Sequence, residues 1–328
     1  MVTLEETDLC FPQLLNSSCR KPIRPHFETM LIYILLSFIA LLTAALNMLV
    51  IISISHFKQL HTPTNLLLLS LAVSDFFVGL LMFFQIILID GCWFLGDLMC
   101  TLYSVLDYIL TSTSVGTMVL ISVDRYVAIC HPLHYSTKIT VREVAFCTCL
   151  CWVCSALYNN LIMKDNLKQP GRYNSCIGQC VIVIDHVAGL VDLILTFIGP
   201  VTVIVVLYMR VFVVAVSQAR AMRSHIAVVT IQNSVKVTKK SELKAAGTLG
   251  VVIVVFLLCL CPYFCVTLTG QDTMLNASSA AFVICLFSFN SCLNPLIYTF
   301  FYPWFRKSVR LIVTLHILKP DSSKINIM

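Results

Sequence analysis

Charged residues are scarce in this sequence. Only 12% of its 328 residues are Asp, Glu, Lys or Arg, whereas about 25% is usual for soluble globular proteins. Hydrophobic residues make up 59% of the chain, and the mean hydropathy is +0.91. This composition excludes a soluble globular protein and predicts an integral membrane protein.

Two further features are missing from the sequence. Residues 1–27 contain no apolar stretch long enough for a cleavable signal peptide, so the first membrane span is expected to act as the insertion signal. The chain has no P-loop, no Gly-x-Ser-x-Gly motif and no His-Glu-x-x-His motif, and we expect neither an enzyme nor a bound organic cofactor. The basic residues that give the net charge of +6 lie in the loops between apolar runs. This distribution indicates a membrane protein rather than a nucleic-acid-binding protein.

Seven apolar runs are long enough to cross a hydrocarbon layer of about 30 Å as helices. The expected fold is therefore an all-α membrane protein with a seven-transmembrane helix bundle. The chain divides into an N-terminal segment (1–29), the bundle (30–300) and a C-terminal segment (301–328). The seven runs lie near residues 30–55, 65–89, 98–130, 143–163, 186–215, 243–268 and 278–300.

The C-terminal segment begins with a mixture of basic and apolar residues. Arg306, Lys307 and Arg310 stand beside Leu311 and Ile312. This mixture predicts a short amphipathic helix on the membrane surface. No cysteine follows the helix, so a palmitate anchor is not available there. The final residues, 319–328, are expected to form a short flexible tail.

The positions of Lys and Arg predict the orientation of the bundle. Sixteen of these residues lie on the side of the membrane that includes Lys58, Arg142 and the C-terminus, and six lie on the other side. The positive-inside rule places the larger set in the cytoplasm. We therefore expect a multi-pass protein of the plasma membrane with an extracellular N-terminus and a cytoplasmic C-terminus.

The third span carries charged residues to both faces of the membrane. Asp107 and Arg125 are 18 residues apart, which corresponds to about 27 Å along a helix. Asp107 is then expected near the outer face, where a ligand can reach it. Asp124, Arg125 and Tyr126 are expected at the inner face, where a signal leaves the molecule.

Three acids, Asp75, Asp107 and Asp192, lie well within the predicted spans, and none has a Lys or Arg at helical spacing in its own span. A charge at this depth costs about 2.5–3.5 kcal/mol on insertion scales. Each acid therefore belongs either to a structural hydrogen-bond network or to a site for a cation. Asp185 lies seven residues before Asp192 and shares its helix face, although a solvated acid at the loop edge explains Asp185 more simply.

Two unpaired carboxylates near the outer face favour a small-molecule amine as ligand. Alkylammonium groups pair with carboxylates and also form cation–π contacts with aromatic rings. Tyr108, Tyr263 and Phe264 are candidates for such rings. Taken singly, each of these rings is better explained by ordinary helix packing.

Six of the 16 cysteines lie on the predicted outer side, and an even number there suggests disulfides. Six cysteines allow 15 pairings, so the residues alone leave the connectivity open. The other ten suit small apolar positions within helices. Asn16 and Asn276 begin N-glycosylation acceptors. The six outer cysteines are Cys10, Cys19, Cys92, Cys100, Cys176 and Cys180.

A set of short motifs occurs in order through the seven spans. They are Asn47, the run LAVSD ending at Asp75, Asp124-Arg125-Tyr126, Trp152, Pro200, Phe256 with Cys259 and Pro262, and Asn294-Pro295-Leu296-Ile297-Tyr298. This pattern resembles the rhodopsin-like G-protein-coupled receptors. Residues 53–65 and 290–305 are similar to the trace amine-associated receptors of that family.

The resemblance implies a ligand site. Asp107 matches the position that holds the ammonium group of the ligand in amine receptors, and Asp192 matches a second acid in members that sense diamines. One acid on each side of a pocket would hold both ends of a dication, and Asp185 would add a contact for a longer polyamine. The expected ligand contacts are Asp107, Asp192, Tyr108, Thr111, Tyr263, Phe264, Ser288 and Asp185.

The resemblance also implies signalling through a heterotrimeric G protein, of the stimulatory or olfactory class. The residues that would carry it are Asp124, Arg125, Tyr126, Tyr208, Glu242, Phe256, Asn294, Pro295 and Tyr298, with a lock between Arg125 and Glu242. A sodium-binding cluster is implied at Asp75, Ser114, Asn290, Ser291 and Asn294. The implied disulfides are Cys100–Cys180, Cys10–Cys176 and Cys19–Cys92.

The sequence departs from the family pattern in the region of the sixth and seventh spans. Leu260 replaces the usual tryptophan two residues before Pro262, and Cys285 and Ser288 replace aromatic residues common in amine receptors. We expect a chemosensory receptor for diamines or polyamines. Three alternatives stay open: a monoamine receptor in which Asp192 is structural, an organic-cation transporter, and a silent or constitutively active receptor.

Overall fold

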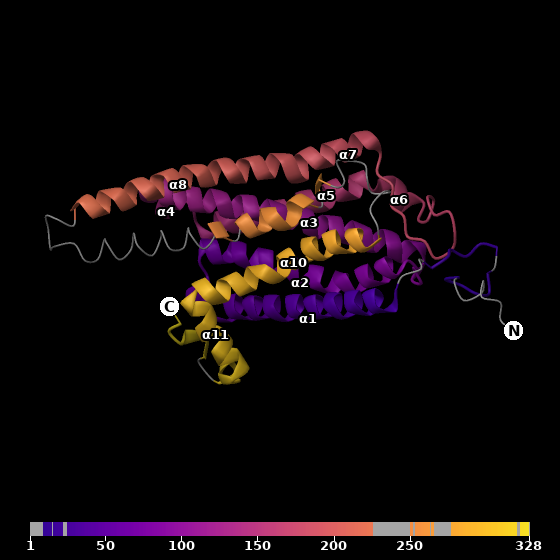
Figure 1. The fold of residues 1–328 in the computed structure, drawn as a ribbon. Coiled ribbons are helices and arrows are strands. Elements are labelled where there is room, and N and C mark those ends of the chain that lie inside the picture. Colours follow the sequence, from indigo (N-terminus) through magenta and orange to yellow (C-terminus); the bar gives the residue numbers. More distant parts are fainter. Residues whose placement is uncertain are drawn as a thin grey trace.

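The computed structural model describes residues 9–14, 16–21, 25–225, 250–251, 253–262, 264–265, 277–319 and 322–327. Long helices run side by side through these residues and form a bundle (Figure 1). The first four long helices end within four residues of the bounds predicted for their spans. They are α1 (His26–His56), α2 (Pro63–Asp90), α3 (Gly96–Cys130) and α5 (Val141–Ile162).

The predicted fifth span is one continuous helix built from α7 (His186–Asp192), η2 (Leu193–Ile198) and α8 (Gly199–His225). The predicted seventh span is α10 (Ala277–Phe301). Within the described residues, five helices are long and apolar enough to cross a membrane. Shorter apolar helical stretches at Ile253–Pro262 and Cys285–Ile297 lie in the predicted sixth and seventh spans. The structure agrees with a seven-helix bundle.

Capping residues explain where two of these helices begin. Thr140 Oγ1 accepts a hydrogen bond from the backbone N–H of Glu143 at 3.3 Å, and Glu143 Oε2 accepts one from the backbone N–H of Thr140 at 3.0 Å. This reciprocal pair satisfies donors that the first turn of α5 cannot pair internally. Thr62 caps α2 through the N–H of Asn65 at 3.3 Å, and Pro63 takes the first helical position, where its missing N–H has no cost.

The fifth span widens directly after Asp192. η2 is a π-helix, and its end is marked by the N–H of Gly199, which donates to the carbonyl of Ile194 five residues earlier. Pro200 has no N–H, and its ring clashes with the carbonyl four residues before it, so a regular α-helix cannot continue here. The wider turn changes the direction of the side chains that precede it, and such turns are frequent at functional sites.

The largest apolar cluster holds the helices together at one end of the bundle. Leu68 of α2, Met118 and Ile121 of α3, and Phe256 of the sixth span are almost completely buried in it. Gly79 of α2 allows a close approach to α1, because a Cβ there would lie 3.0 Å from the backbone nitrogen of Ala44. The cluster fixes the helices that carry the residues described below.

Three disulfides join the N-terminal segment, the loop between α2 and α3, the start of α3 and the loop before α7, and we call this the disulfide end of the bundle. Cys100 is bonded to Cys180, as the resemblance implies. The other two expected pairings are wrong. The structure bonds Cys10 to Cys92 and Cys19 to Cys176, with Cα–Cα distances of 5.4 and 5.1 Å.

Backbone hydrogen bonds explain the correct pairing. The N–H of Cys19 donates to the carbonyl of Ile177 at 2.9 Å, and the N–H of Ile177 donates to the carbonyl of Ser17 at 2.7 Å. These bonds align the N-terminal segment with the loop and place Cys19 next to Cys176. The segment then turns back on itself through a bond from Cys10 N–H to the Cys19 carbonyl, which leaves Cys10 beside Cys92.

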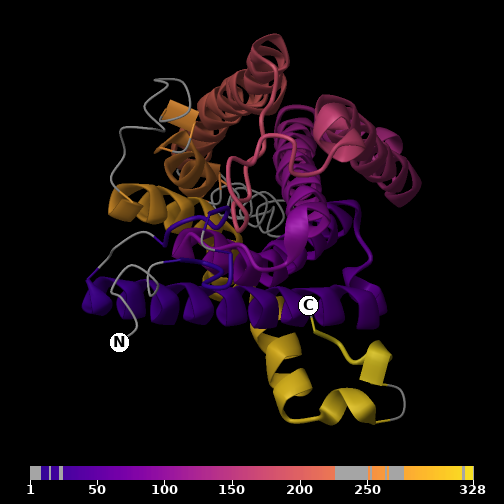
Figure 2. The ribbon, with the colours of Figure 1, turned by 90° about the vertical axis from the view of Figure 1, so that its right-hand side faces the viewer.

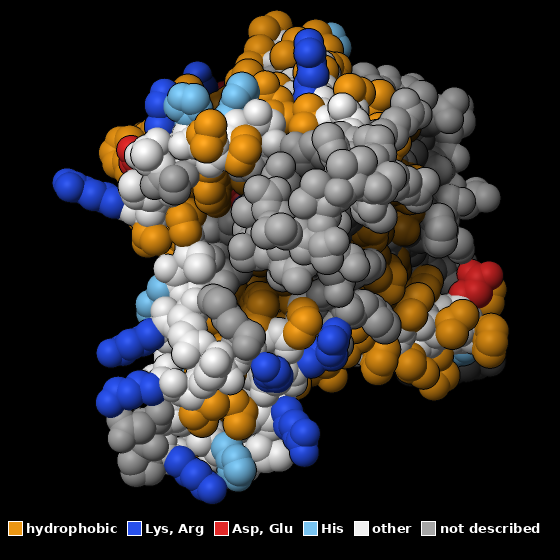
Figure 3. All heavy atoms as spheres, turned by 90° about the vertical axis from the view of Figure 1, so that its left-hand side faces the viewer, with side chains coloured by type: hydrophobic (Ala, Val, Ile, Leu, Met, Phe, Trp, Pro, Cys, Tyr) orange, Lys and Arg blue, Asp and Glu red, His pale blue; other side chains and the backbone are white. Residues whose placement is uncertain are grey.

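The opposite end of the bundle, which contains Arg125, carries the short elements η1 (Lys58–Leu60) and α4 (Pro132–Lys138). We call it the Arg125 end. Lys and Arg side chains gather on this face (Figure 3). The predicted amphipathic helix is present as α11 (Pro303–Val313), which buries Trp304 and Phe305 and exposes Arg306, Lys307 and Arg310.

The chain turns back after α11 through η4 (His316–Leu318) and η5 (Ser322–Lys324), and we call residues 303–327 the C-terminal hairpin. The expectation of a flexible tail is wrong for residues 322–327. Ser322 Oγ lies 2.9 Å from Nε2 of His56, and the N–H of Ile327 donates to Oε1 of Gln59 at 3.3 Å. The side chain of Ile327 is buried in the main apolar cluster. Apolar burial against α1 and η1 therefore holds the tail.

Candidate functional site

A cavity of about 640 Å³ opens among α2, α3, α7, η2, residue 264 and α10, in the half of the bundle near the disulfide end. Seven of the eight predicted ligand contacts line it. The eighth, Tyr263, lies outside the described residues. The seven are Asp107, Tyr108, Thr111, Asp185, Asp192, Phe264 and Ser288.

Asp107 lies on the face of α3 that borders the cavity. Tyr103 and Thr111, one turn before and one turn after it, also line the cavity, as expected for residues four apart on a helix. Within the described part of the chain, the Asp107 carboxylate has no hydrogen-bond donor and no basic partner. A half-buried carboxylate without compensation favours a cationic ligand.

Asp192 lies at the end of α7, directly before the π-helical turn. Its carboxylate accepts a hydrogen bond from Tyr158 Oη of α5 at 3.3 Å. Its backbone carbonyl accepts a bond from Thr196 Oγ1 at 2.7 Å. One phenol donates a single hydrogen bond and leaves the negative charge of Asp192 in place, so this carboxylate can still attract a cation.

Asp185 has a structural role at the start of α7 that explains an acid at this position. Its side chain is exposed and accepts a hydrogen bond from the backbone N–H of Val187 at 3.1 Å, which caps the start of α7. Asp185 also borders the cavity. The simpler interpretation from the sequence, a solvated acid at the edge of a loop, thus agrees with the structure. The structure adds that Asp185 caps the start of α7.

Several residues that line the cavity or contact its lining do not follow from the sequence. Tyr158 contacts Asp192, and Gln85 of α2 lines the cavity with its side-chain oxygen accepting a bond from Tyr103 Oη. The position of Tyr103, one turn before Asp107, is the feature of the sequence that could indicate its place in the cavity. Phe197 of η2 stacks on Phe264, and no sequence pattern pairs residues from these two spans.

The predicted sodium cluster is partly assembled around Asp75. This carboxylate is completely buried and accepts hydrogen bonds from Ser291 Oγ and Asn294 Nδ2, both at 2.8 Å. Ser114 instead donates to Ser74 Oγ at 2.9 Å. In the described residues, Oδ1 of Asn290 and Oδ1 of Asn294 are buried without a hydrogen-bond partner. Carboxylate, hydroxyl and amide oxygens suit a hard cation, so these residues fit a sodium ion.

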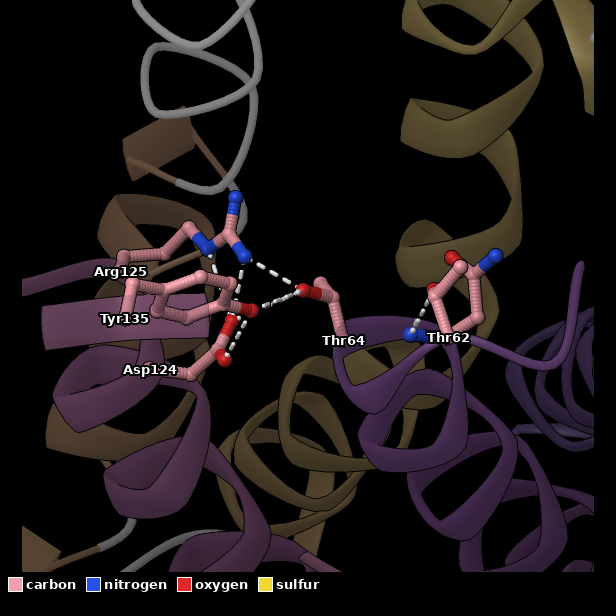
Figure 4. A network of polar contacts seen from close by, with 6 residues as sticks. Thr62, Thr64, Asp124, Arg125 and Tyr135 are labelled. Carbon is pink, nitrogen blue, oxygen red and sulfur yellow. Dashed lines mark hydrogen bonds and ion pairs between the residues drawn. The ribbon is translucent and has the colours of Figure 1, made fainter. Parts of the chain in front are cut away.

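At the Arg125 end, Asp124 and Arg125 belong to a network with residues of α2 and α4 (Figure 4). Asp124 accepts hydrogen bonds at 2.9 Å from Thr64 Oγ1, from Tyr135 Oη and from Nε of Arg125. Arg125 also donates to Thr64 Oγ1. Glu242, the expected partner of Arg125, lies outside the described residues. Thr64 and Tyr135 do not follow from the sequence, because they belong to other helices, α2 and α4, and reach Asp124 only through packing.

The other predicted signalling residues are distributed along the same half of the bundle. The ring of Tyr126 packs edge-on against His131, with centroids 5.6 Å apart. The hydroxyl of Tyr208 is buried with no hydrogen-bond partner among the described residues. Phe256 belongs to the main apolar cluster, and Pro295 lies within α10. The side chain of Tyr298 lies outside the described part of the chain.

Comparison with known proteins places these features in a family. Residues 46–298 match the family model for the seven-transmembrane receptors of the rhodopsin family. Trace amine-associated receptor 13c of Danio rerio is 38% identical over 340 residues, which covers 98% of this chain and 97% of the relative. Trace amine-associated receptor 4 of Mus musculus is 37% identical, covering 97% of this chain and 94% of the relative.

A third relative gives the same result. Trace amine-associated receptor 8a of Rattus norvegicus is 38% identical, covering 97% of this chain and 96% of the relative. The rhodopsin family consists of multi-pass plasma-membrane receptors that act through heterotrimeric G proteins, so this chain is a receptor and neither an enzyme nor a transporter. The chain belongs to the trace amine-associated receptors, within the rhodopsin family of seven-transmembrane receptors.

Proposed function

We propose that this receptor recognises diamines or polyamines, and that Asp107 and Asp192 bind the two ammonium groups of one ligand. The observation that carries the proposal is that both carboxylates border the same cavity, one from α3 and one from α7. A monoamine would neutralise one of them and leave the other uncompensated in a site of low polarity. A dication neutralises both.

The cavity suits such a ligand in size and lining. Its volume of about 640 Å³ falls within the range of about 300–1,000 Å³ that is common for small-molecule sites. Phe264 and Tyr108 provide aromatic surface for an ammonium group or for the alkyl chain between two of them. Asp185 borders the cavity and would attract a third ammonium group of a longer polyamine.

The second candidate is a monoamine receptor in which Asp192 is structural. The hydrogen bond from Tyr158 to Asp192 favours it. The two candidate functions predict different responses to amines when the charge of Asp192 is removed. If Asp192 binds an ammonium group, the loss affects two-headed amines much more than one-headed amines. If Asp192 only orients α7 against α5, the loss affects both ligand classes alike.

The proposal includes an orientation and a signalling partner. The three disulfides suit the extracellular side, where the environment is oxidising. The basic Arg125 end suits the cytoplasm. A G protein of the stimulatory or olfactory class would bind there after the sixth span moves away from α3, and the receptor would serve chemosensation. Sodium at Asp75 and glycans at Asn16 and Asn276 complete the proposal.

The test is the cAMP response of cells that express the chain, with straight-chain amines of increasing length bearing one or two amino groups. We expect Asp107→Asn to abolish the response to both classes. We expect Asp192→Asn to reduce the potency of diamines at least tenfold, equivalent to about 1.4 kcal/mol, with little change for monoamines. Asp165→Asn is the matched control, because it removes an exposed acid of α6 (Lys164–Lys168) that does not line the cavity.

Surface expression is measured for every variant, so that loss of response is separated from loss of protein. A diamine response that survives in Asp192→Asn at full potency would overturn the two-carboxylate site. Equal losses for monoamines and diamines in that variant would favour the structural role of Asp192 instead.

A further inference from the structure

Two consecutive residues of α5 connect the helices that carry the two carboxylates. The hydroxyl of Tyr158 donates a hydrogen bond to Oδ1 of Asp192 at 3.3 Å. Nδ2 of Asn159 donates one to Oγ of Ser112 in α3 at 3.0 Å. Because neighbouring residues of a helix point about 100° apart, a single turn of α5 can contact α7 and α3 at the same time.

The Asn159 contact fixes α5 relative to the helix of Asp107. Asn159 is completely buried, and its Nδ2 also donates to the backbone carbonyl of Ser155 at 2.8 Å. Ser112 lies five residues after Asp107 and lines the same cavity. α3 packs against both α5 and η2, as the view from the disulfide end shows (Figure 2). The position of Tyr158 is therefore defined relative to Asp107.

The Tyr158 contact limits where the Asp192 carboxylate can lie. An Asp side chain without a partner can exchange between staggered rotamers, which moves its carboxylate. Thr196 Oγ1 donates to the backbone carbonyl of Asp192, and this bond does not orient the side chain. Within the described residues, the bond from Tyr158 is the one hydrogen bond between α5 and α7. Tyr158 does not line the cavity, so it acts on a ligand through Asp192.

The bond to Tyr158 is compatible with ligand binding by Asp192. The two oxygens of a carboxylate can accept about four hydrogen bonds, so Asp192 can pair with an ammonium group while Oδ1 stays bonded to Tyr158. The attraction between an ammonium group and a carboxylate depends on their separation and is strongest where polarity is low. A carboxylate held in place therefore favours one ligand length, and its ordering costs nothing when the ligand binds.

We propose that Tyr158 is a specificity-determining residue, which fixes the Asp192 carboxylate at one distance from Asp107 and thereby selects two-headed amines by the length of the chain between their amino groups. This inference rests on the proposed two-carboxylate site. Tyr158 is a positioning residue that does not touch the ligand, and the bond between Asn159 and Ser112 holds it in register with α3.

The test is the dependence of the cAMP response on ligand length in cells that express the full-length receptor. The ligands are straight-chain diamines that differ by one methylene at a time, beside the monoamines of the same lengths. Tyr158→Phe removes the hydroxyl and keeps the ring. The matched control is Tyr173→Phe, which removes the same group from an exposed tyrosine of the loop before α7 that does not line the cavity. Surface expression is measured for every variant.

We expect the parent receptor and Tyr173→Phe to respond to one diamine length at concentrations at least tenfold lower than to diamines two methylenes longer or shorter. Tyr158→Phe should reduce this preference to less than threefold, because the released carboxylate can follow the second ammonium group. The potency of monoamines should stay the same. A length preference that is as sharp in Tyr158→Phe as in the parent would overturn the inference.

The Asp192→Asn background separates this inference from the proposed function. Tyr158→Phe should have no further effect there, because the carboxylate that it positions is absent. If Asp192→Asn does not weaken diamines selectively, the two-carboxylate site fails and the inference fails with it. If Asp192→Asn does so and Tyr158→Phe leaves the length preference intact, the inference alone fails. Equal losses for monoamines and diamines in Tyr158→Phe would show that Tyr158 only packs α5 against α7, and would also overturn it.

Discussion

The ring of Phe197 lies parallel to the ring of Phe264, with centroids 4.2 Å apart and an angle of 14° between the planes. Phe197 belongs to the π-helical turn that follows Asp192, and Phe264 belongs to the sixth span and lines the cavity. The pair therefore joins the turn that follows Asp192 to the sixth span, which carries an expected ligand contact and is the helix expected to move. Leu260 lies one turn before Phe264 and is buried, in the position where the family usually has tryptophan.

We expect Phe197→Leu to lower the maximal response to ligand while changing ligand affinity less than threefold. Phe197 does not line the cavity, so its loss affects the contact with the sixth span rather than the ligand itself. An aromatic pair contributes about 0.5–1.5 kcal/mol beyond its buried area, which corresponds to a roughly twofold to tenfold shift between receptor states. Radioligand binding and cAMP accumulation on the same membranes measure the two effects, and an unchanged maximal response would contradict the prediction.

Thr64→Val should raise signalling in the absence of ligand. The hydroxyl of Thr64 donates to Asp124 and accepts from Arg125, so its removal weakens the network that holds Arg125. Hydrogen bonds to charged groups contribute about 1.5–3 kcal/mol, and a basal increase of severalfold is expected. Basal cAMP at matched surface expression is the measurement. Thr137→Val, at an exposed position of α4, should have no effect, and equal basal activity in both variants would argue against the network.

Asp75→Asn should remove any effect of sodium on ligand binding. The substitution keeps the size of the side chain and removes the charge that a sodium ion requires. We expect the affinity of the parent receptor to differ between sodium chloride and the chloride of a bulky organic cation. That difference should disappear in the variant. An equal sodium effect in the two proteins would place the ion elsewhere.

The corrected disulfide pairing predicts a pattern among double variants. Cys10→Ala with Cys92→Ala breaks one bridge, and so does Cys19→Ala with Cys176→Ala. Cys10→Ala with Cys176→Ala breaks two. A bridge typically contributes about 2–4 kcal/mol, so the third variant should unfold at a distinctly lower temperature than the first two. If the third variant melted like a single Cys10→Ala variant, the pairing described above would be incorrect.

The seven spans and the acids that border the ligand cavity could be predicted because they depend on local properties of the chain. The length of an apolar run determines whether a helix can cross the membrane. The spacing of Tyr103, Asp107 and Thr111 determines that they share one face of α3. The acids could be identified as candidate site residues because a charge at membrane depth is costly, whichever residues surround it.

Only the tertiary structure decided which residues from distant segments meet. The pairing of Cys19 with Cys176 depends on hydrogen bonds between the N-terminal segment and a loop more than 150 residues away. The contacts of Asp192 with Tyr158 and of Arg125 with Thr64 depend on how helices pack side by side. The tail is held because Ile327 finds an apolar site beside α1 and η1. Helical periodicity and hydrophobicity therefore determined the spans by themselves, whereas these long-range contacts exist only once packing has brought their partners together.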